Sequence, residues 1–357
     1  MEAFIRSTGN ISPQETYNNY TFLEKITEHE GPFLKCVEPD YKRILPKDKL
    51  PRRLSRSLKI GLTAAGICLK DAGLEMPDAI ITGTGIGMLA DTEKFLTTML
   101  DNNEKFLNPA SFIQSTHNTI GAHIAVMLQC NKYNFTYVHG SLSFESALLN
   151  SMFLLEEDPL KSILVGGVDE MTDQHCRIKI VNRKYKKEPF KHLNLLSYNS
   201  EGAIPGEGAT FFVLTGKPDH RNFAMIAGMK TFYKPTNVNE ITENISGFLY
   251  QQGLDLESID LVLLGYNGDR KASEVYDELC TKYLQNRLQA CFKHLCGEYP
   301  TSSAFAVWLA ANIIKRNSIP GIITLNTKPV KDPIRHILLY NHDQNVNHSL
   351  ILLSACN

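Results

Sequence analysis

The sequence predicts an α/β fold with mostly parallel sheets. Short runs of Val, Ile and Leu alternate along the chain with longer segments of helical periodicity. Such alternation is typical of sheets covered by helices on both faces. The chain has 357 residues, 43% of them hydrophobic, which is enough to bury a large core.

The predicted elements form two series separated by a polar stretch at 215–222. In the first series we expect strands at 79–82, 136–139, 162–165 and 209–214, with helices between them. The second series begins at Phe223, and in it we expect strands at 261–264, 321–325, 334–339 and 349–353 and helices at 272–283 and 303–315. We find no sequence repeat between the two series.

One turn in the first series has the shape of a nucleophile elbow. A strand around Tyr137 runs through Gly140 into an apolar helix, and this places Ser141 at the start of the helix. The helix leads to a short buried strand that ends in Gly166 and Gly167.

Charge and cysteine content exclude several classes of protein. The net charge of −1 gives no electrostatic signature for nucleic acid or an acidic membrane surface. No stretch approaches the ~18 apolar residues of a membrane span, and no basic and apolar leader precedes the first strand, so we expect a cytoplasmic protein. The eight cysteines are scattered, and Cys291 and Cys296 do not have convincing metal-ligand spacing. We expect buried free thiols and no metal.

Together these motifs resemble the β-ketoacyl synthases of the thiolase superfamily. In that family the nucleophilic cysteine lies 26 residues before the second glycine of the pair, and the same count from Gly167 arrives at Ser141. Further similar segments follow in family order, at 5–13, 52–56, 83–87, 108–123 and 205–214. The resemblance implies a thiolase-like five-layer αβαβα fold with mixed, mostly parallel sheets. It also implies two similar halves, 1–218 with the degenerate elbow and 219–357 with degenerate histidine motifs.

The resemblance places two catalytic histidines in the second half, and neither is present. The first histidine position falls on Gly265, or on Tyr266 if the alignment shifts by one. The second falls on Glu298, after a lead in which Lys293 matches the family's motif lysine. We expect an ion pair between Lys293 and Glu298. The family's closing glycine loop is replaced by 342–347, where only Asn347 matches.

A serine cannot replace the cysteine thiolate without a general base within hydrogen-bond reach. A helix N-terminus favours a thiolate, but an alcohol is too weak an acid for the same field to ionise it. The resemblance therefore implies a chain-length-factor-like subunit without condensing activity, similar to degenerate subunits of aryl polyene and flexirubin-type pigment clusters. It needs no cofactor. Its expected partners are an active β-ketoacyl synthase, or a second copy of itself, and an acyl carrier protein.

Two other functions stay open. Ser141 could accept an acyl group in a transferase or hydrolase, with His139 two residues away as a candidate base. The chain could also be a homodimeric scaffold that holds acyl chains or an acyl carrier protein. In the family the strand before the nucleophile, here 134–138, pairs across the dimer, and an unpaired edge strand needs such cover. The residues that correspond to the family's acyl tunnel are Ile86, Ser111, Phe112 and His117.

Overall fold

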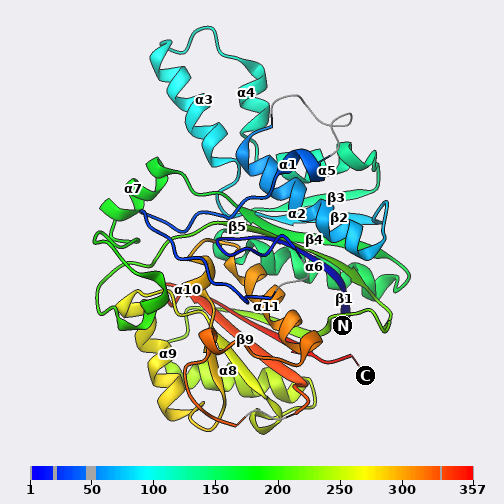
Figure 1. Cartoon of the computed structure of the whole chain (residues 1–357), viewed down its shortest axis with the longest axis vertical. Coiled ribbons are helices and arrows are strands. Elements are labelled where there is room, and N and C mark those ends of the chain that lie inside the picture. The colour runs from blue at the N-terminus through cyan, green and yellow to red at the C-terminus, as the bar shows by residue number, and fades with distance from the viewer. Residues whose placement is uncertain (1, 19–21, 46–53, 330–331, 357) are drawn as a thin grey trace.

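The computed structural model describes residues 2–18, 22–45, 54–329 and 332–356. Arg52 and Arg53, which belong to the Arg-rich segment of the resemblance, lie outside the described residues. Ten strands form one mixed sheet in the order β3-β2-β4-β5-β1-β6-β10-β9-β7-β8. Figure 1 shows the strands stacked through the middle of the molecule, with the helices above, between and below them.

The strand order of the first half repeats in the second. The first half comprises β1 (Ala3–Ile11), β2 (Ala79–Gly83), β3 (Tyr133–Tyr137), β4 (Ser162–Asp169) and β5 (Gly208–Thr215). The second comprises β6 (Ala224–Tyr233), β7 (Leu261–Leu264), β8 (Gln289–Cys291), β9 (His336–Asp343) and β10 (Asn347–Ser354). In the first half β2 lies parallel between β3 and β4, and β5 runs antiparallel to β4. In the second half β7 lies parallel between β8 and β9 in the same way, and β10 runs antiparallel to β9. Antiparallel pairing of β1 with β6 joins the halves.

Alternating side chains of these strands divide the core into separate clusters. Along β2, Ile81 points into the central cluster while Ile80 points into an outer one. Along β7, Leu263 and Leu264 divide in the same way between the central cluster and the second outer one. Because strand side chains alternate between faces, each half-sheet is apolar on both sides.

The helices form the three remaining layers. The middle layer is α6 (Ser143–Glu157) and α11 (Ser302–Arg316), whose side chains fill the central cluster. The outer layers are α2 (Arg56–Ala72) with α5 (Thr119–Leu128), and α8 (Val238–Gln251) with α9 (Arg270–Lys282). The expected five-layer thiolase-like fold is confirmed.

Five further helices of the described chain lie outside these layers. α3 (Leu89–Asp101) and α4 (Pro109–Gln114) project from the top of the molecule in Figure 1, and neither contains a buried residue. α7 (Asp173–Val181) follows β4, and the short helices are α1 (Tyr41–Ile44) and α10 (Lys293–Cys296). Short 3₁₀ turns occur at Gly140–Leu142, His192–Ser197, Leu256–Ser258 and Gly321–Ile323.

Most predicted elements are present within a few residues, but the strand expected at 321–325 is wrong. After Pro320 the chain forms the 3₁₀ turn Gly321–Ile323, and Thr324 makes only an isolated bridge to Ala290. The edge of the second half-sheet is instead β8, whose three residues were not predicted. A short apolar run does not by itself distinguish a strand from a turn that packs on the core.

Candidate functional site

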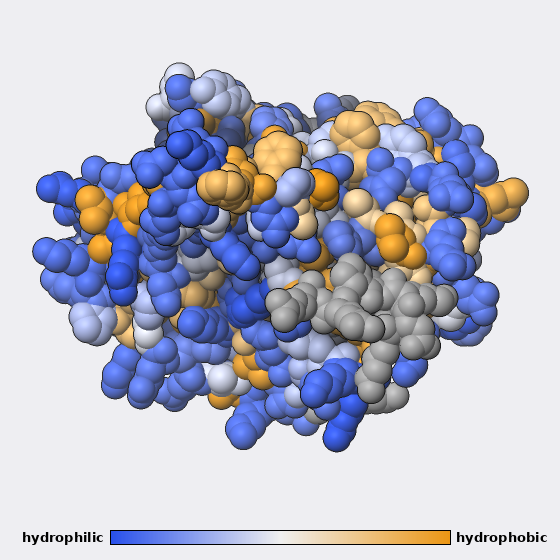
Figure 2. All heavy atoms as spheres, turned by 90° about the horizontal axis from the view of Figure 1, so that it is seen from above, coloured by the Kyte–Doolittle hydropathy of each residue, from blue (hydrophilic) through white to orange (hydrophobic). Residues whose placement is uncertain are grey.

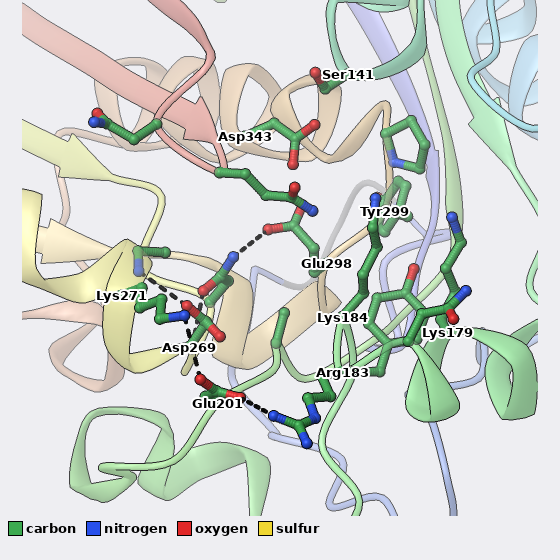
Figure 3. Close-up of a pocket in the computed structure, with 18 of the residues that line it drawn as sticks. Ser141, Lys179, Arg183, Lys184, Glu201, Asp269, Lys271, Glu298, Tyr299 and Asp343 are labelled. Carbon is green, nitrogen blue, oxygen red and sulfur yellow. Dashed lines mark hydrogen bonds and ion pairs between the residues drawn. The ribbon is translucent and has the colours of Figure 1, made fainter. Parts of the chain in front are cut away.

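A cavity of about 1000 Å³ opens between the two halves, where the elbow of the first half faces the ends of strands from the second. Figure 3 shows the side chains that line it. Two of the predicted catalytic positions, Ser141 and Glu298, lie on its wall, as does the tunnel residue Ile86. Sequence positions more than 150 residues apart are therefore brought to one site.

The elbow that carries Ser141 is fixed by Ser143. The buried Ser143 hydroxyl accepts a hydrogen bond from the His139 N–H at 2.8 Å, and it lies within hydrogen-bond distance of the Thr84 and Gly140 carbonyls. Gly140 has a φ of 54°, in the left-handed region that glycine adopts without strain. Ser141 then lies in the 3₁₀ turn that leads directly into α6. The elbow predicted from the sequence is present.

The Ser141 hydroxyl has no general base beside it within the part of the chain that the structure describes. Its hydrogen bond comes from the Asn347 side chain, whose Nδ2 donates to Oγ over 3.2 Å. An amide N–H cannot take up a proton from the hydroxyl. The His139 ring lies instead 3.4 Å from the Ser146 hydroxyl. This arrangement holds the hydroxyl in place but does not activate it.

Glu298 lies across the cavity from Ser141, at the centre of a cluster of polar side chains with Lys293 and Asn267. Its Oε2 accepts a hydrogen bond from Lys293 Nζ at 2.7 Å and another from Asn267 Nδ2 at 2.7 Å. Lys293 is only 1% exposed, so the expected ion pair is present and largely desolvated. Burial raises the pKa of Glu298, while the attraction of Lys293 opposes the rise. A paired carboxylate in this position cannot donate a hydrogen bond to a substrate carbonyl as an imidazole N–H would.

Gly265 does not face the cavity. A side chain there would meet Asn341 Oδ1 at 2.1 Å and the Tyr276 hydroxyl at 2.7 Å, so the fold leaves no room for a histidine. Asn267, two residues later, lines the cavity and contacts Glu298.

The loop that replaces the family's glycine gate is a tight hairpin turn between β9 and β10. Gln344 and Asn345 have φ values of 51° and 53°, and the Val346 N–H donates to the Asp343 carbonyl at 2.9 Å. Two consecutive residues with positive φ are typical of a type I′ turn. The Asn345 N–H also donates to the buried His342 ring at 3.1 Å. The turn therefore forms a fixed part of the cavity wall.

Asp169, at the end of β4, organises the floor of the cavity. One carboxylate oxygen accepts hydrogen bonds from the Thr84 hydroxyl and from the backbone N–H groups of Gly85 and Ile86, at 2.9–3.0 Å. The other accepts from the Thr301 hydroxyl and N–H, at 2.9 and 3.0 Å. This buried side chain ties the glycine turn of the first half to the start of α11 in the second. No sequence motif points to Asp169.

The remaining tunnel residues lie away from the cavity. Ser111 and Phe112 belong to α4, where Phe112 is 57% exposed and packs against Phe95 with 5.6 Å between ring centroids. The His117 ring fills the space beside Gly87 that a side chain there would need. The structure thus brings Ile86 to the cavity and places Ser111, Phe112 and His117 near the outer surface.

Apolar side chains are exposed along the free edge of the first half-sheet. β3 is the end strand, pairs only with β2, and presents the rings of Tyr133 and Phe135, which stack at 6.2 Å. Other exposed apolar residues lie on α4, α5, α6 and the segment after β3, namely Phe112, Ile113, Val126, Val138 and Phe153. Figure 2 views the end of the molecule that carries α3 and α4 and shows hydrophobic patches among hydrophilic side chains. Patches of this kind mark interaction surfaces.

Two classes of site are not found among the described residues. No group of three or more His, Cys, Asp or Glu side chains there could hold a metal ion, and Cys291 and Cys296 are both buried free thiols. Within the same ranges no helix has the length and hydropathy to cross a membrane.

Comparison with known proteins identifies the family. The family model for the β-ketoacyl synthase N-terminal domain matches residues 7–220, more than half of the chain. A search of curated proteins gives no match. Among solved structures, the ishigamide ketosynthase/chain length factor aligns with a TM-score of 0.80 and 17% identity, covering 100% of this chain and 99% of that one.

Two further solved structures have the same fold at low identity. A type II polyketide synthase ketosynthase in complex with its acyl carrier protein, AntDE:AntF, aligns with a TM-score of 0.78 and 12% identity, covering 99% of both chains. The ketosynthase ApeO in complex with its chain length factor ApeC, from Xenorhabdus doucetiae, aligns with a TM-score of 0.71 and 15% identity, covering 99% of this chain and 98% of that one. The match over residues 7–220 and the shared fold show that the chain belongs to the β-ketoacyl synthase family.

Proposed function

We propose that this chain is a non-condensing, chain-length-factor-like subunit that pairs with an active β-ketoacyl synthase and shapes its acyl tunnel. It would act in polyketide or fatty-acid-type elongation on acyl carrier protein, in the cytoplasm. We also propose that residues 1–218 and 219–357 are its two halves, since the strand order repeats on either side of this boundary.

The observation that carries this proposal is the cluster of polar side chains in which Lys293 and Asn267 contact Glu298. Condensation needs a thiolate and imidazoles that assist loss of the malonyl carboxylate and stabilise the oxyanion. Here Lys293 and Asn267 both donate to a carboxylate, and Asn347 donates to the Ser141 hydroxyl. Each of these donors is already engaged within the protein. Loss of oxyanion donors alone costs about 10²–10³ in rate, and loss of a general acid or base costs a similar factor.

The free edge of β3 supports the proposal that a partner binds. An exposed edge strand with stacked aromatic side chains is an unfavourable surface in a lone subunit, because it can pair with another chain. Antiparallel pairing with the same strand of a similar subunit would cover Tyr133 and Phe135 and satisfy the edge hydrogen bonds. Two of the solved relatives are ketosynthases described with a chain length factor, and a third is in complex with an acyl carrier protein.

Co-expression with an active synthase subunit of the same genome tests the pairing. We expect a 1:1 complex in size-exclusion chromatography with light scattering. Phe135→Lys should abolish the complex, because a charge on the edge blocks sheet pairing. Leu160→Lys serves as the matched control, since Leu160 is 74% exposed and lies before β4. Equal complex formation by both variants would contradict pairing at β3. A homodimer that excludes the synthase would instead support the scaffold function.

A further inference from the structure

Two buried histidines lie at the base of the hairpin turn that forms part of the cavity wall. His342 on β9 and His348 on β10 are directly opposite each other in the antiparallel ladder. Their ring centroids are 5.2 Å apart, and the two residues are only 2% and 0% exposed. Imidazole is the side chain whose ordinary pKa lies closest to neutral pH. The pair therefore places two titratable groups, shielded from water, beside the turn.

His342 holds the turn only while its ring is neutral. The ring Nδ1 accepts a hydrogen bond from the Asn345 N–H at 3.1 Å, so this nitrogen carries no proton here. Asn345 is one of the two turn residues with positive φ, and it lines the cavity. Protonation of Nδ1 would replace the acceptor with a second donor that faces the Asn345 N–H. The hydrogen bond from the turn to β9 would then be lost.

The surroundings of His342 oppose a positive charge. Its ring stacks on Tyr276 of α9 with 4.5 Å between centroids, and its Nε2 has no hydrogen-bond partner among the described residues. Burial lowers the pKa of His342 well below 6.5, and repulsion by His348 and by the buried Lys293 of α10 adds to this effect. The backbone of Ala272 favours the charged form but does not offset these effects.

His348 is in a similar environment. Its ring stacks on Phe232 of β6 at 4.8 Å, and its Nδ1 lies 2.9 Å from the Tyr340 hydroxyl on β9. The backbone of Asn345 and the carboxylate of Glu240 on α8 favour a charge on His348. Burial outweighs both and lowers the pKa of His348 from 6.5 to about 4. Within the described chain no carboxylate forms an ion pair with either ring.

We propose that His342 and His348 form an acid-sensitive latch, which holds the turn in the cavity wall near neutral pH and releases it when the rings are protonated. Release would also affect the elbow, because Asn347, next to His348 at the start of β10, donates the hydrogen bond to Ser141. Figure 3 shows Asp343, at the end of β9 beside the turn, near Ser141. The inference concerns the isolated chain and does not depend on the proposed function.

The latch should weaken as the pH falls below about 6.5. A histidine in the released turn takes up a proton with an ordinary pKa of about 6.5, whereas the buried ring of His348 does so only near pH 4. The released state therefore binds more protons than the closed state between these pH values, and acid favours release. Each histidine that is freed should raise the ratio of released to closed turn about twentyfold between pH 7 and pH 5.

Hydrogen exchange of the intact wild-type chain tests the latch directly. Peptides that span 341–347 are followed by mass spectrometry at pH 7 and pH 5, and each rate is divided by that of an unstructured peptide at the same pH. This relative rate should rise about twentyfold if one ring is freed and roughly 400-fold if both are. Peptides from β1 and β5, in the interior of the sheet, report global unfolding and should change far less. An unchanged rate in the turn, or an equal rise in β1 and β5, would overturn the latch.

His342→Asn separates protonation from the hydrogen bond. The Asn Oδ1 can accept the Asn345 N–H in place of Nδ1, but an amide does not take up a proton in this pH range. The pH-dependent rise should therefore be about twentyfold smaller in this variant than in wild type. His220→Asn is the matched control, because the His220 side chain is 87% exposed, and it should behave as wild type. A full rise in His342→Asn would contradict the latch.

A second measurement on wild type needs no variant. Exchange of the imidazole C2 hydrogens with deuterium, followed by mass spectrometry against pH, reports the titration of each ring. We expect the midpoints for His342 and His348 to lie below 6.5, with that of His348 near 4. Midpoints near 6.5 for both rings would show that burial does not hold them neutral, and the latch would be excluded.

Discussion

At the scale of single residues, the substitution of a hydroxyl for a thiol decides what the elbow can do. The field at a helix N-terminus is worth about 0.3–1 kcal/mol, and up to ~2 kcal/mol in partly buried sites. At about 1.36 kcal/mol per pKa unit, such a field can bring a thiol from a pKa of about 8.5 to near 7. An alcohol, with an acidity near that of water, stays protonated. Ser141 therefore needs a base, and its neighbour Asn347 is a donor.

Ser141→Cys should create the most reactive thiol in the chain. Six of the eight native cysteines are buried, and burial raises the pKa of thiols such as Cys68 and Cys291, to about 12 in each case. We expect iodoacetamide to label the new thiol first, as followed by peptide mass spectrometry near pH 7. Ser146→Cys, in the second turn of α6, is the matched control. A Ser141→Cys thiol that reacts no faster than this control would show that the helix start does not favour a thiolate.

Glu145 gives the core a pH dependence that the sequence did not predict. It lies in the first turn of α6, where burial raises its pKa from 4.5 to about 7. Ser349 on β10 donates to it at 3.0 Å, and Ser303 on α11 and Lys293 on α10 favour its charged form. Since the folded chain binds this proton more tightly than the unfolded chain, the stability that Glu145 contributes is greatest below about pH 4.5. It falls as the pH rises through about 7.

Glu145→Gln should therefore stabilise the protein at high pH. We expect a gain of roughly 2–3 kcal/mol at pH 8 and under about 1 kcal/mol at pH 5, because the neutral amide pays no desolvation cost of a charge. Urea unfolding at the two pH values measures the difference. Glu156→Gln, an exposed change on the same helix, should show no such dependence. A gain that is the same at both pH values would argue against titration of Glu145.

At the scale of elements, Asp169 links the end of β4 to the glycine turn after β2 and to the start of α11. Asp169→Asn replaces one acceptor oxygen with a donor facing N–H groups, which leaves buried donors unsatisfied. We expect a loss of roughly 2–4 kcal/mol in the free energy of unfolding, measured with urea. Asp173→Asn, exposed in the first turn of α7, should cost under about 1 kcal/mol. Equal losses in both variants would mean that the Asp169 hydrogen bonds contribute little.

The helices α3 and α4 carry Phe112, which we propose to line the acyl tunnel at the contact with the partner subunit. Phe112 is exposed and packs against Phe95 of α3, so Phe112→Ala should leave the isolated chain stable within about 0.5 kcal/mol. In the complex, a smaller side chain should admit longer products if Phe112 closes the tunnel. Products of the co-expressed pair are compared by mass spectrometry. Unchanged product length from an intact complex would exclude Phe112 as the stopper.

The sequence predicts a feature well when the residues that form it are close together in the chain. The elbow at Ser141 and the lead at Lys293 are contiguous motifs, and both were found where the structure has them. Asp169 and Asn267 act through contacts with residues about 30–130 positions away, which no local pattern reveals. The left-handed turn at Arg183, where φ is 57°, could not be predicted either, because an arginine does not indicate a positive φ as a glycine would.

At the scale of the whole molecule, the repeated strand order accounts for the position of the cavity. Each half contributes the carboxyl ends of its parallel strands, and pairing of β1 with β6 fixes the halves against each other. The alternation of apolar segments was enough to predict the α/β class and most strand positions. It did not predict β6 or β8. β8 has only three residues, and in β6 apolar residues stand at consecutive positions with Gly228 among them, so the sequence lacks the period of two that is typical of a strand.

The central claim is that this subunit does not condense acyl chains by itself. The most direct test incubates the purified chain with acyl- and malonyl-loaded carrier protein and follows condensation and decarboxylation by mass spectrometry. We predict no product from the isolated wild type, from Ser141→Cys or from Ser141→Ala, and full activity when an active synthase partner is added to wild type. Turnover by the isolated wild-type chain that is lost in Ser141→Ala would contradict the claim and identify Ser141 as an acyl acceptor.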